Sequence, residues 1–162
     1  MKRLALPLCL AIGFLGLDAH AEGGGIVPPI EHVATLKECG ACHLAFSPQM
    51  LPARSWKKLM SDLTNHFGEN AGLPDSTRAE IVAYLVANAG DAALSKNGRY
   101  FLRGIDPSET PLRITETPFW QGVHEEVPNA YFTSAQVKTP ANCVACHRTA
   151  AKGIFGEGGE GE

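Results

Sequence analysis

The chain is organised around two stretches that share one pattern, Cys39-Gly40-Ala41-Cys42-His43 and Cys143-Val144-Ala145-Cys146-His147. Cys-x-x-Cys-His is the pattern of covalent c-type haem attachment. Two thiols add to the two vinyl groups of one porphyrin, and the next residue turns back to bind the iron. One helical turn brings positions i, i+3 and i+4 to the same face of the backbone, as this chemistry requires. The two stretches therefore predict two covalently bound haem c groups.

The roles of the motif residues follow from the same chemistry. Thioether bonds are expected at Cys39, Cys42, Cys143 and Cys146, and proximal iron ligation at His43 and His147. Four thiols would also suit two disulfide bonds or one structural zinc ion. Neither alternative explains a histidine directly after each cysteine pair. Zinc fingers and ribbons also separate their pairs by roughly 15–20 residues, whereas each pair here has its own part of the chain.

The first 21 residues have the composition of an export signal, and c-type haem is attached outside the cytoplasm. Two basic residues precede an apolar run over residues 4–17 that is too short to span a bilayer. Residues 19–21 form a small-residue cleavage site, so the mature chain is expected to begin near Glu22 and to lie in the periplasm. Cleavage removes Cys9 and leaves four thiols for four thioether bonds. A lipoprotein anchor at Cys9 is disfavoured, because few apolar residues precede it.

The charge of the exported chain bears on its partners. Without residues 1–21 the chain keeps 141 residues, with 12 basic and 16 acidic side chains and a net charge of about −4. Negative charge argues against nucleic acid and anionic membranes, and it favours a partner with a basic docking face. No later apolar stretch is long enough for stable insertion into a membrane.

Helical patterns broken by many turns predict a mainly α, small cytochrome c-like fold with extensive loops. Helices are expected over about residues 31–43, 55–67 and 77–90, from Thr117 towards Pro128, and across the second motif, with a short strand at residues 100–102. The chain divides into a first haem-binding half, residues 22–95, and a second, residues 96–155. Residues 156–162 contain only glycine and glutamate and are expected to form a disordered acidic tail.

Each iron needs a second axial ligand, which histidine or methionine can supply. His66 and His124 each end or follow an aromatic-rich helical stripe, one in each half, and they are the predicted distal ligands. We expect His66 on the haem attached at residues 39 and 42, and His124 on the haem attached at residues 143 and 146. A crossed arrangement is left open. Trp120 lies one helical turn before His124, so the indole is expected to pack against the imidazole.

Three other side chains are weaker candidates for the distal positions. His32 precedes its own motif and would face the wrong side of the haem. Met60 belongs to the apolar stripe of its helix, which indicates core packing. Met50 follows His43 so closely that its loop would have difficulty reaching the opposite haem face.

The segment His66-Phe67-Gly68-Glu69-Asn70-Ala71, the segment Pro118-Phe119-Trp120 with His124, and the two motifs together resemble the bacterial dihaem cytochrome c family. The resemblance covers most of the mature chain. It implies a periplasmic electron carrier with bis-histidine haems. It also implies a partner that is an oxygen-binding monohaem cytochrome, the sphaeroides haem protein, with a membrane cytochrome as the expected donor.

Three functions are compatible with these features. An electron-transfer protein without enzyme activity is favoured, because both irons have a candidate for each axial position and the cofactor does the chemistry. A small dihaem peroxidase-like enzyme would need one iron with an open position. A redox subunit of a larger complex is the third alternative.

Overall fold

The structure is a computed structural model that describes residues 25–92, 95 and 97–156. The expected export signal and the tail beyond residue 156 lie outside the described residues. The described chain contains six short α-helices and five 3-10 turns and no named strand, which confirms the mainly α fold class. The α-helices are α1 (Val33–Cys39), α2 (Ala53–Met60), α3 (Asp75–Ala87), α4 (Gly98–Phe101), α5 (Pro118–Val123) and α6 (Asn129–Phe132). The 3-10 turns are η1 (Pro48–Met50), η2 (Leu63–Asn65), η3 (Ile114–Glu116), η4 (Cys143–Ala145) and η5 (Ala150–Lys152).

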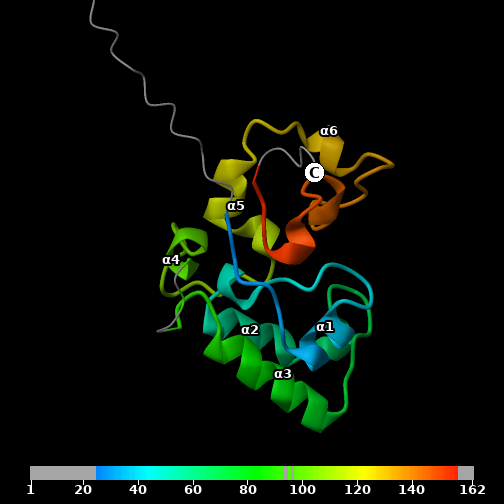
Figure 1. Ribbon diagram of the computed structural model, residues 1–162, viewed down its shortest axis with the longest axis vertical. Helices are drawn as coiled ribbons and strands as arrows, with labels where there is room; N and C mark the ends of the chain where they lie inside the picture. The colour runs from blue at the N-terminus through cyan, green and yellow to red at the C-terminus, as the bar shows by residue number, and fades with distance from the viewer. Residues whose placement is uncertain (1–24, 93–94, 96, 157–162) are drawn as a thin grey trace, which may run out of the picture.

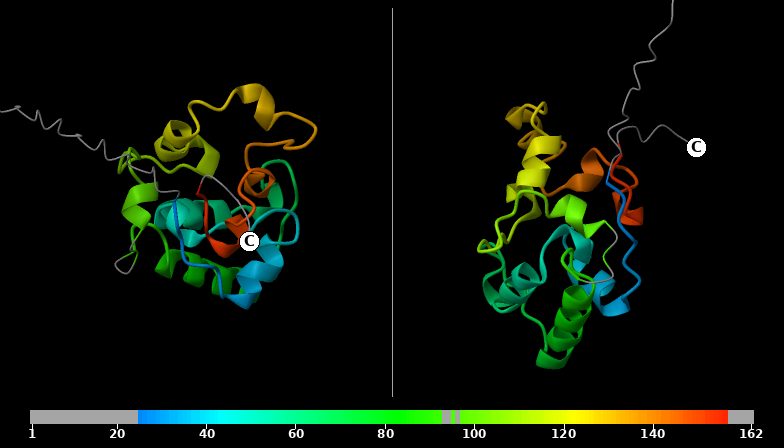
Figure 2. Two further views of the ribbon diagram at one scale, coloured as in Figure 1. Left: turned by 45° about the horizontal axis from the view of Figure 1, so that its top comes forward. Right: turned by 90° about the vertical axis from the view of Figure 1, so that its left-hand side faces the viewer.

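The helices gather at two ends of the molecule. Figure 1 shows α1, α2 and α3 together at one end, and α5, α6 and the C-terminal segment at the other. The turned views in Figure 2 keep the same separation, with α4 beside the middle. No helix in residues 25–92, 95 and 97–156 has the length and apolar character needed to cross a membrane.

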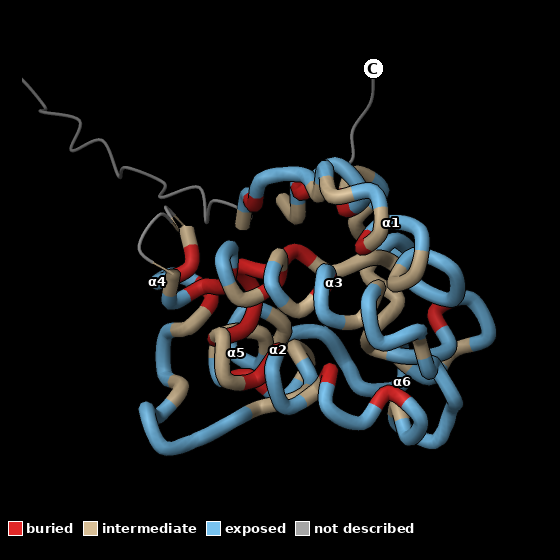
Figure 3. Tube along the Cα trace, turned by 90° about the horizontal axis from the view of Figure 1, so that it is seen from below, coloured by how far each residue is buried: buried red, intermediate tan, exposed pale blue. Residues whose placement is uncertain are grey.

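The main hydrophobic core lies between α2 and α3. Its buried members are Leu51, Trp56, Met60, Leu63, Ile81, Leu85 and Ala89. Burial of one such large side chain stabilises the fold by about 1.5–3 kcal/mol. Met60 is only 2% exposed, so its prediction as a core residue is confirmed. Figure 3 shows these buried stretches inside a surface of exposed loops.

A second apolar cluster joins the two halves of the chain. Val27, Met50 and Phe101 are its buried members, and Phe119 and Phe155 pack against them. The ring centres of Phe101 and Phe119 lie 5.1 Å apart in an edge-to-face arrangement. Residues from both ends of the sequence therefore share one small core.

The two ends of the described chain also pair through their backbones. The amide of Val27 donates to the carbonyl of Gly153 over 2.8 Å, and the amide of Phe155 donates to the carbonyl of Gly25 over 3.1 Å. Gly153 has a φ of +80°, and a Cβ at this position would lie 2.1 Å from the carbonyl oxygen of Val27. Only glycine fits here, because a side chain would be strained and would also push the two strands of chain apart.

We expect the substitution Gly153→Ala to lower the free energy of unfolding of the haem-loaded protein by about 1–3 kcal/mol. Denaturant unfolding checks this value. Gly122→Ala is the matched control, because Gly122 lies in α5 and a Cβ there would meet no atom within 4 Å. The control should leave stability unchanged or raise it by up to about 1 kcal/mol. Equal stability of the two variants would contradict the tight approach at Gly153.

The predicted end of the second helix is wrong, and the cause is local. The helix expected over residues 55–67 starts at Ala53 and ends at Met60. The Ser61 hydroxyl donates to the carbonyl of Lys58, and Asp62 then leaves the helical region with φ −142° and ψ 63°. Polar side chains that bond to nearby backbone often end a helix in this way. The remainder becomes η2 and a turn that contains His66.

Two other predicted elements also differ from the structure. The third helix begins at Asp75, directly after Pro74, and not at Thr77, and no side chain caps its start. Residues 100–102, predicted as a short strand, belong to α4 and the residue after it. The helix predicted from Thr117 is confirmed at its start, because the Thr117 hydroxyl accepts from the amide of Trp120 and proline follows the cap.

Candidate functional site

The helix predicted over residues 31–43 would have contained the first Cys-x-x-Cys-His stretch. In the structure the stretch lies at the end of α1. Cys39 is the last helical residue, and the amide of Gly40 donates to the carbonyl of Leu36 over 3.0 Å. A Cβ on Gly40 would lie 2.3 Å from that carbonyl oxygen, so the turn needs glycine. The backbone then turns through residues 40–43. Cys39 is half-buried, and Cys42 is exposed.

The second stretch forms a single turn, η4, and not the longer helix that was predicted. The amides of Cys146 and His147 donate to the carbonyl of Cys143 over 3.2 and 2.7 Å. One turn is enough to bring both thiols and the histidine to one side. As in the first stretch, the leading cysteine is half-buried and the other is exposed. Burial raises the pKa of the Cys39 and Cys143 thiols, so both favour the protonated form.

Disulfide bonds and a zinc site, the alternative uses of the thiols, are absent from the described residues. All four motif cysteines there are free. Within the same ranges, no group of three or more histidine, cysteine, aspartate or glutamate side chains is placed to hold a metal ion.

The histidines of the first half face one another. The ring centres of His43 and His66 lie 6.1 Å apart, with their planes 19° from parallel. His66 is carried by a tight turn after η2, in which its amide donates to the carbonyl of Glu69 over 2.8 Å. The structure thus brings the predicted distal ligand of this half opposite the predicted proximal one.

The histidines of the second half form a matching pair. The ring centres of His124 and His147 lie 6.0 Å apart, and their planes are nearly perpendicular at 85°. His124 caps the end of α5, where the indole of Trp120 stacks on it at 4.3 Å, as the helical spacing predicted. The ring of Phe132 in α6 lies beside both, with its centre 5.3 Å from that of Trp120 and 6.1 Å from that of His124.

Both spacings suit a metal between the rings. With metal–imidazole bonds of about 2 Å, two imidazoles that bind one metal from opposite sides have ring centres about 6 Å apart. Nδ1 of His43 lies 2.7 Å from the carbonyl of Leu44, and Nδ1 of His124 lies 2.8 Å from the carbonyl of Trp120. A carbonyl only accepts, so each Nδ1 carries the hydrogen and each Nε2 keeps a free lone pair for a metal.

The surroundings of His66 favour its neutral form. Burial lowers the pKa of His66, and the nearby charges of His43 and Arg113 lower it further. Neutral imidazole is the form that binds metals. Arg113 comes from the second half of the chain, and the sequence patterns did not single it out.

The weaker ligand candidates have other roles. His32 caps α1, where its Nδ1 accepts from the amide of Thr35 over 3.3 Å. Its Nε2 lies 3.1 Å from the carboxylate of Glu80, and its ring stacks on Tyr84 at 4.5 Å. Both ring nitrogens are therefore engaged within the first half. Met50 is only 5% exposed and packs in the second apolar cluster.

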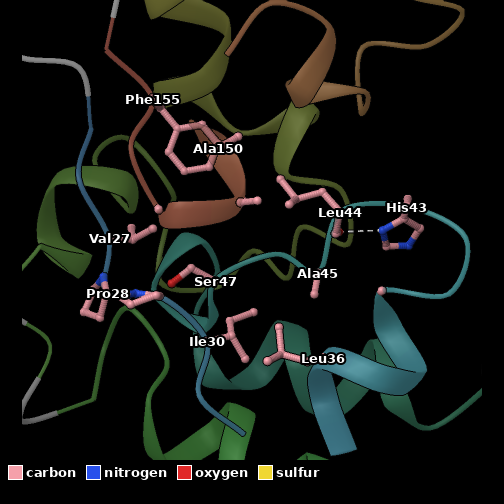
Figure 4. A pocket seen from close by; sticks show the side chains of 14 residues that line it. Val27, Pro28, Ile30, Leu36, His43, Leu44, Ala45, Ser47, Ala150 and Phe155 are labelled. Atoms are coloured by element: carbon pink, nitrogen blue, oxygen red, sulfur yellow. Dashed lines mark hydrogen bonds between the residues drawn. The ribbon is translucent and has the colours of Figure 1, made fainter. Parts of the chain in front are cut away.

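An apolar cavity of about 210 Å³ opens beside the first motif (Figure 4). His43 and Leu44 line one side, with Leu36 and Ile30 below, and Phe155 and Ala150 lie across from them. Leu36 is 45% exposed here, and Val144, inside the second motif, is 44% exposed. A planar apolar group attached at the motifs would cover such side chains, so the residues present fit haem.

Phe155 connects this cavity to the second histidine pair. Its ring lines the cavity with His43, and its centre lies 5.8 Å from the ring centre of His147. The backbone pairing of Phe155 with Gly25 holds it there. The sequence placed Phe155 at the end of the second half and carried no signal for this bridging position.

Comparisons with known proteins agree with one another. A family model described as dihaem cytochrome c matches residues 35–155. Diheme cytochrome c from Rhodobacter sphaeroides is 42% identical, with a TM-score of 0.72 over 80% of this chain and 100% of that chain. A crystal structure of DHC purified from Rhodobacter sphaeroides is 41% identical, with a TM-score of 0.65 over 78% of this chain and 99% of that one.

A third solved structure is more distant. The diheme cytochrome type c from Shewanella baltica is 33% identical, with a TM-score of 0.61 over 76% of this chain and 85% of that chain. The comparison with curated proteins found no match.

Proposed function

Because the chain belongs to the dihaem cytochrome c family, with two covalently bound haem c groups, we propose that it is a periplasmic electron carrier without enzyme activity. Haem c, when bound, takes up and releases one electron at its iron. The polypeptide attaches, orients and shields the two groups.

The observation that carries this proposal is the presence of two opposed histidine pairs at nearly equal spacing, 6.1 and 6.0 Å. We assign His43 with His66 to the haem attached at residues 39 and 42. His124 with His147 serves the haem attached at residues 143 and 146. Two imidazoles at each iron leave no position for a substrate, which supports a carrier over a peroxidase-like enzyme.

The surrounding chain fixes the ligand rings. The carbonyl of Leu44 accepts from Nδ1 of His43 and sets the rotation of that ring. At the second pair, the carbonyl of Trp120 does the same for His124, and the indole stacks on the imidazole. Such outer contacts hold the ligands in place while the charge at the iron changes, which favours fast electron transfer.

Carbon monoxide binding tests the function. The reduced protein should bind no carbon monoxide at neutral pH, because both axial positions of both irons are taken. Its oxidised form should give two low-spin paramagnetic resonance signals. Binding of one carbon monoxide per protein would favour the peroxidase-like alternative.

The partner is proposed from charge. A net charge of about −4 favours a redox partner with a basic docking face, and an oxygen-binding monohaem cytochrome like the sphaeroides haem protein is the proposed acceptor. A membrane cytochrome is the proposed donor. Steering by charge requires the rate of electron transfer to fall as salt rises. A rate that does not depend on salt would contradict this docking mode.

A further inference from the structure

The turn that carries His66 is strained at the next residue. His66 and Glu69 exchange backbone hydrogen bonds of 2.8 and 3.1 Å, so Phe67 and Gly68 are the two central residues of a tight turn. Both have positive φ, +56° and +101°. Turns of this type favour asparagine followed by glycine, and a bulky side chain at the first position is uncommon. Phe67 nevertheless occupies this position, and the residue is 44% exposed.

A cation from a distant part of the chain lies on that ring. The guanidinium of Arg113 is 3.8 Å from the centre of the Phe67 ring, which is close for a cation–π contact. Arg113 immediately precedes η3, and its Nε lies 3.4 Å from the carboxylate of Glu116. The cation–π contact stabilises the exposed ring and so offsets part of the energetic cost of the positive φ at Phe67. It also fixes one positive charge at the residue adjoining His66.

We propose that Arg113 is a positioning residue that fixes a positive charge beside His66 and thereby raises the reduction potential of the iron that His66 binds. The inference rests on the proposed function, in which His66 is an iron ligand. An oxidised haem carries one more positive charge than a reduced haem, so a fixed cation nearby disfavours oxidation. Glu116 offsets part of this effect, because its carboxylate pairs with the same guanidinium.

The chain offers a matched control for the charge. Arg103 also places its guanidinium over an exposed ring, at 5.4 Å from the centre of Tyr100. Tyr100 adjoins none of the four paired histidines in the sequence. Removal of the Arg103 charge therefore changes the net charge equally without changing the turn at residues 66–69.

The test is a redox titration that follows each haem separately by paramagnetic resonance. The two pairs should give distinct signals, because their ring planes differ by 19° in one pair and by 85° in the other. Arg113→Gln should lower the potential of the near-parallel haem and leave the other unchanged. Glu116→Gln should raise the same potential, whereas Arg103→Gln should move neither. Arg113→Lys should lower that potential by less than half as much as Arg113→Gln does, because the positive charge remains.

The outcomes distinguish a failure of the role proposed for Arg113 from a failure of the proposed function. Unshifted potentials in Arg113→Gln and Glu116→Gln, with normal low-spin signals, would overturn the role of Arg113 and leave the electron-carrier function intact. A shift of both haems by the same amount, or an equal shift in Arg103→Gln, would also overturn it. A wild-type spectrum without bis-histidine signals would overturn the assignment of His66 and this inference with it.

Discussion

Replacement of both Cys143 and Cys146 by alanine should leave a mature protein that carries one covalently bound haem in place of two. Neither thioether bond of the second motif can then form, while Cys39 and Cys42 stay intact. The second half should also lose structure, because η4 lies beside η5, which leads into the segment that pairs with the start of the described chain. Intact mass and a haemochrome assay measure the haem content.

Cys9→Ala is the control for this prediction. Cys9 belongs to the expected export signal, so the mature mass and both haems should be unchanged. Two haems in the double variant, or zinc in the purified protein, would contradict the assignment of the second motif.

The substitution His66→Ala should open one iron. The reduced variant should bind one carbon monoxide per protein, whereas the parent protein should bind none, because the ring opposite His43 has been removed. His124→Ala should have the same effect at the other iron. Absorption spectra of the reduced protein with and without carbon monoxide measure the stoichiometry.

His32→Ala is the matched control for the loss of a histidine. It removes the cap of α1 and the contact with Glu80, so it should lower stability by about 1 kcal/mol without changing either haem spectrum. Fully low-spin, six-coordinate spectra in His66→Ala would show that another side chain had been the ligand.

The parts of the site that follow from short-range chemistry could be predicted from the sequence. The spacing of the motif cysteines defines a single turn, and the proline after Thr117 defines the start of the helix that His124 caps at its end. The placement of His66 opposite His43 does not follow from short-range chemistry. It depends on a turn that the helical stripe over residues 55–67 concealed, because Ser61 and Asp62 stop the helix early.

The remaining features depend on contacts between distant residues. The place of Phe155 beside His147 requires the two ends of the described chain to meet, and no local pattern encodes that meeting. Arg113 reaches Phe67 from another part of the sequence. A positive φ at a phenylalanine could not be predicted from the sequence either, because bulky residues rarely adopt the left-handed region.

The pairing of Gly25 and Val27 with Phe155 and Gly153 bears on the order of maturation. A chain exported from its N-terminus delivers residues 25–27 first and residues 153–155 among the last. On the proposed export from the N-terminus, the first motif reaches the haem-attachment machinery while residues 153–155, which pair with residues 25–27, are still on the cytoplasmic side. The first haem would be loaded onto an open half, and the closing of the chain ends would come only after the second motif has followed. A block late in export should consequently yield a singly loaded, protease-sensitive species.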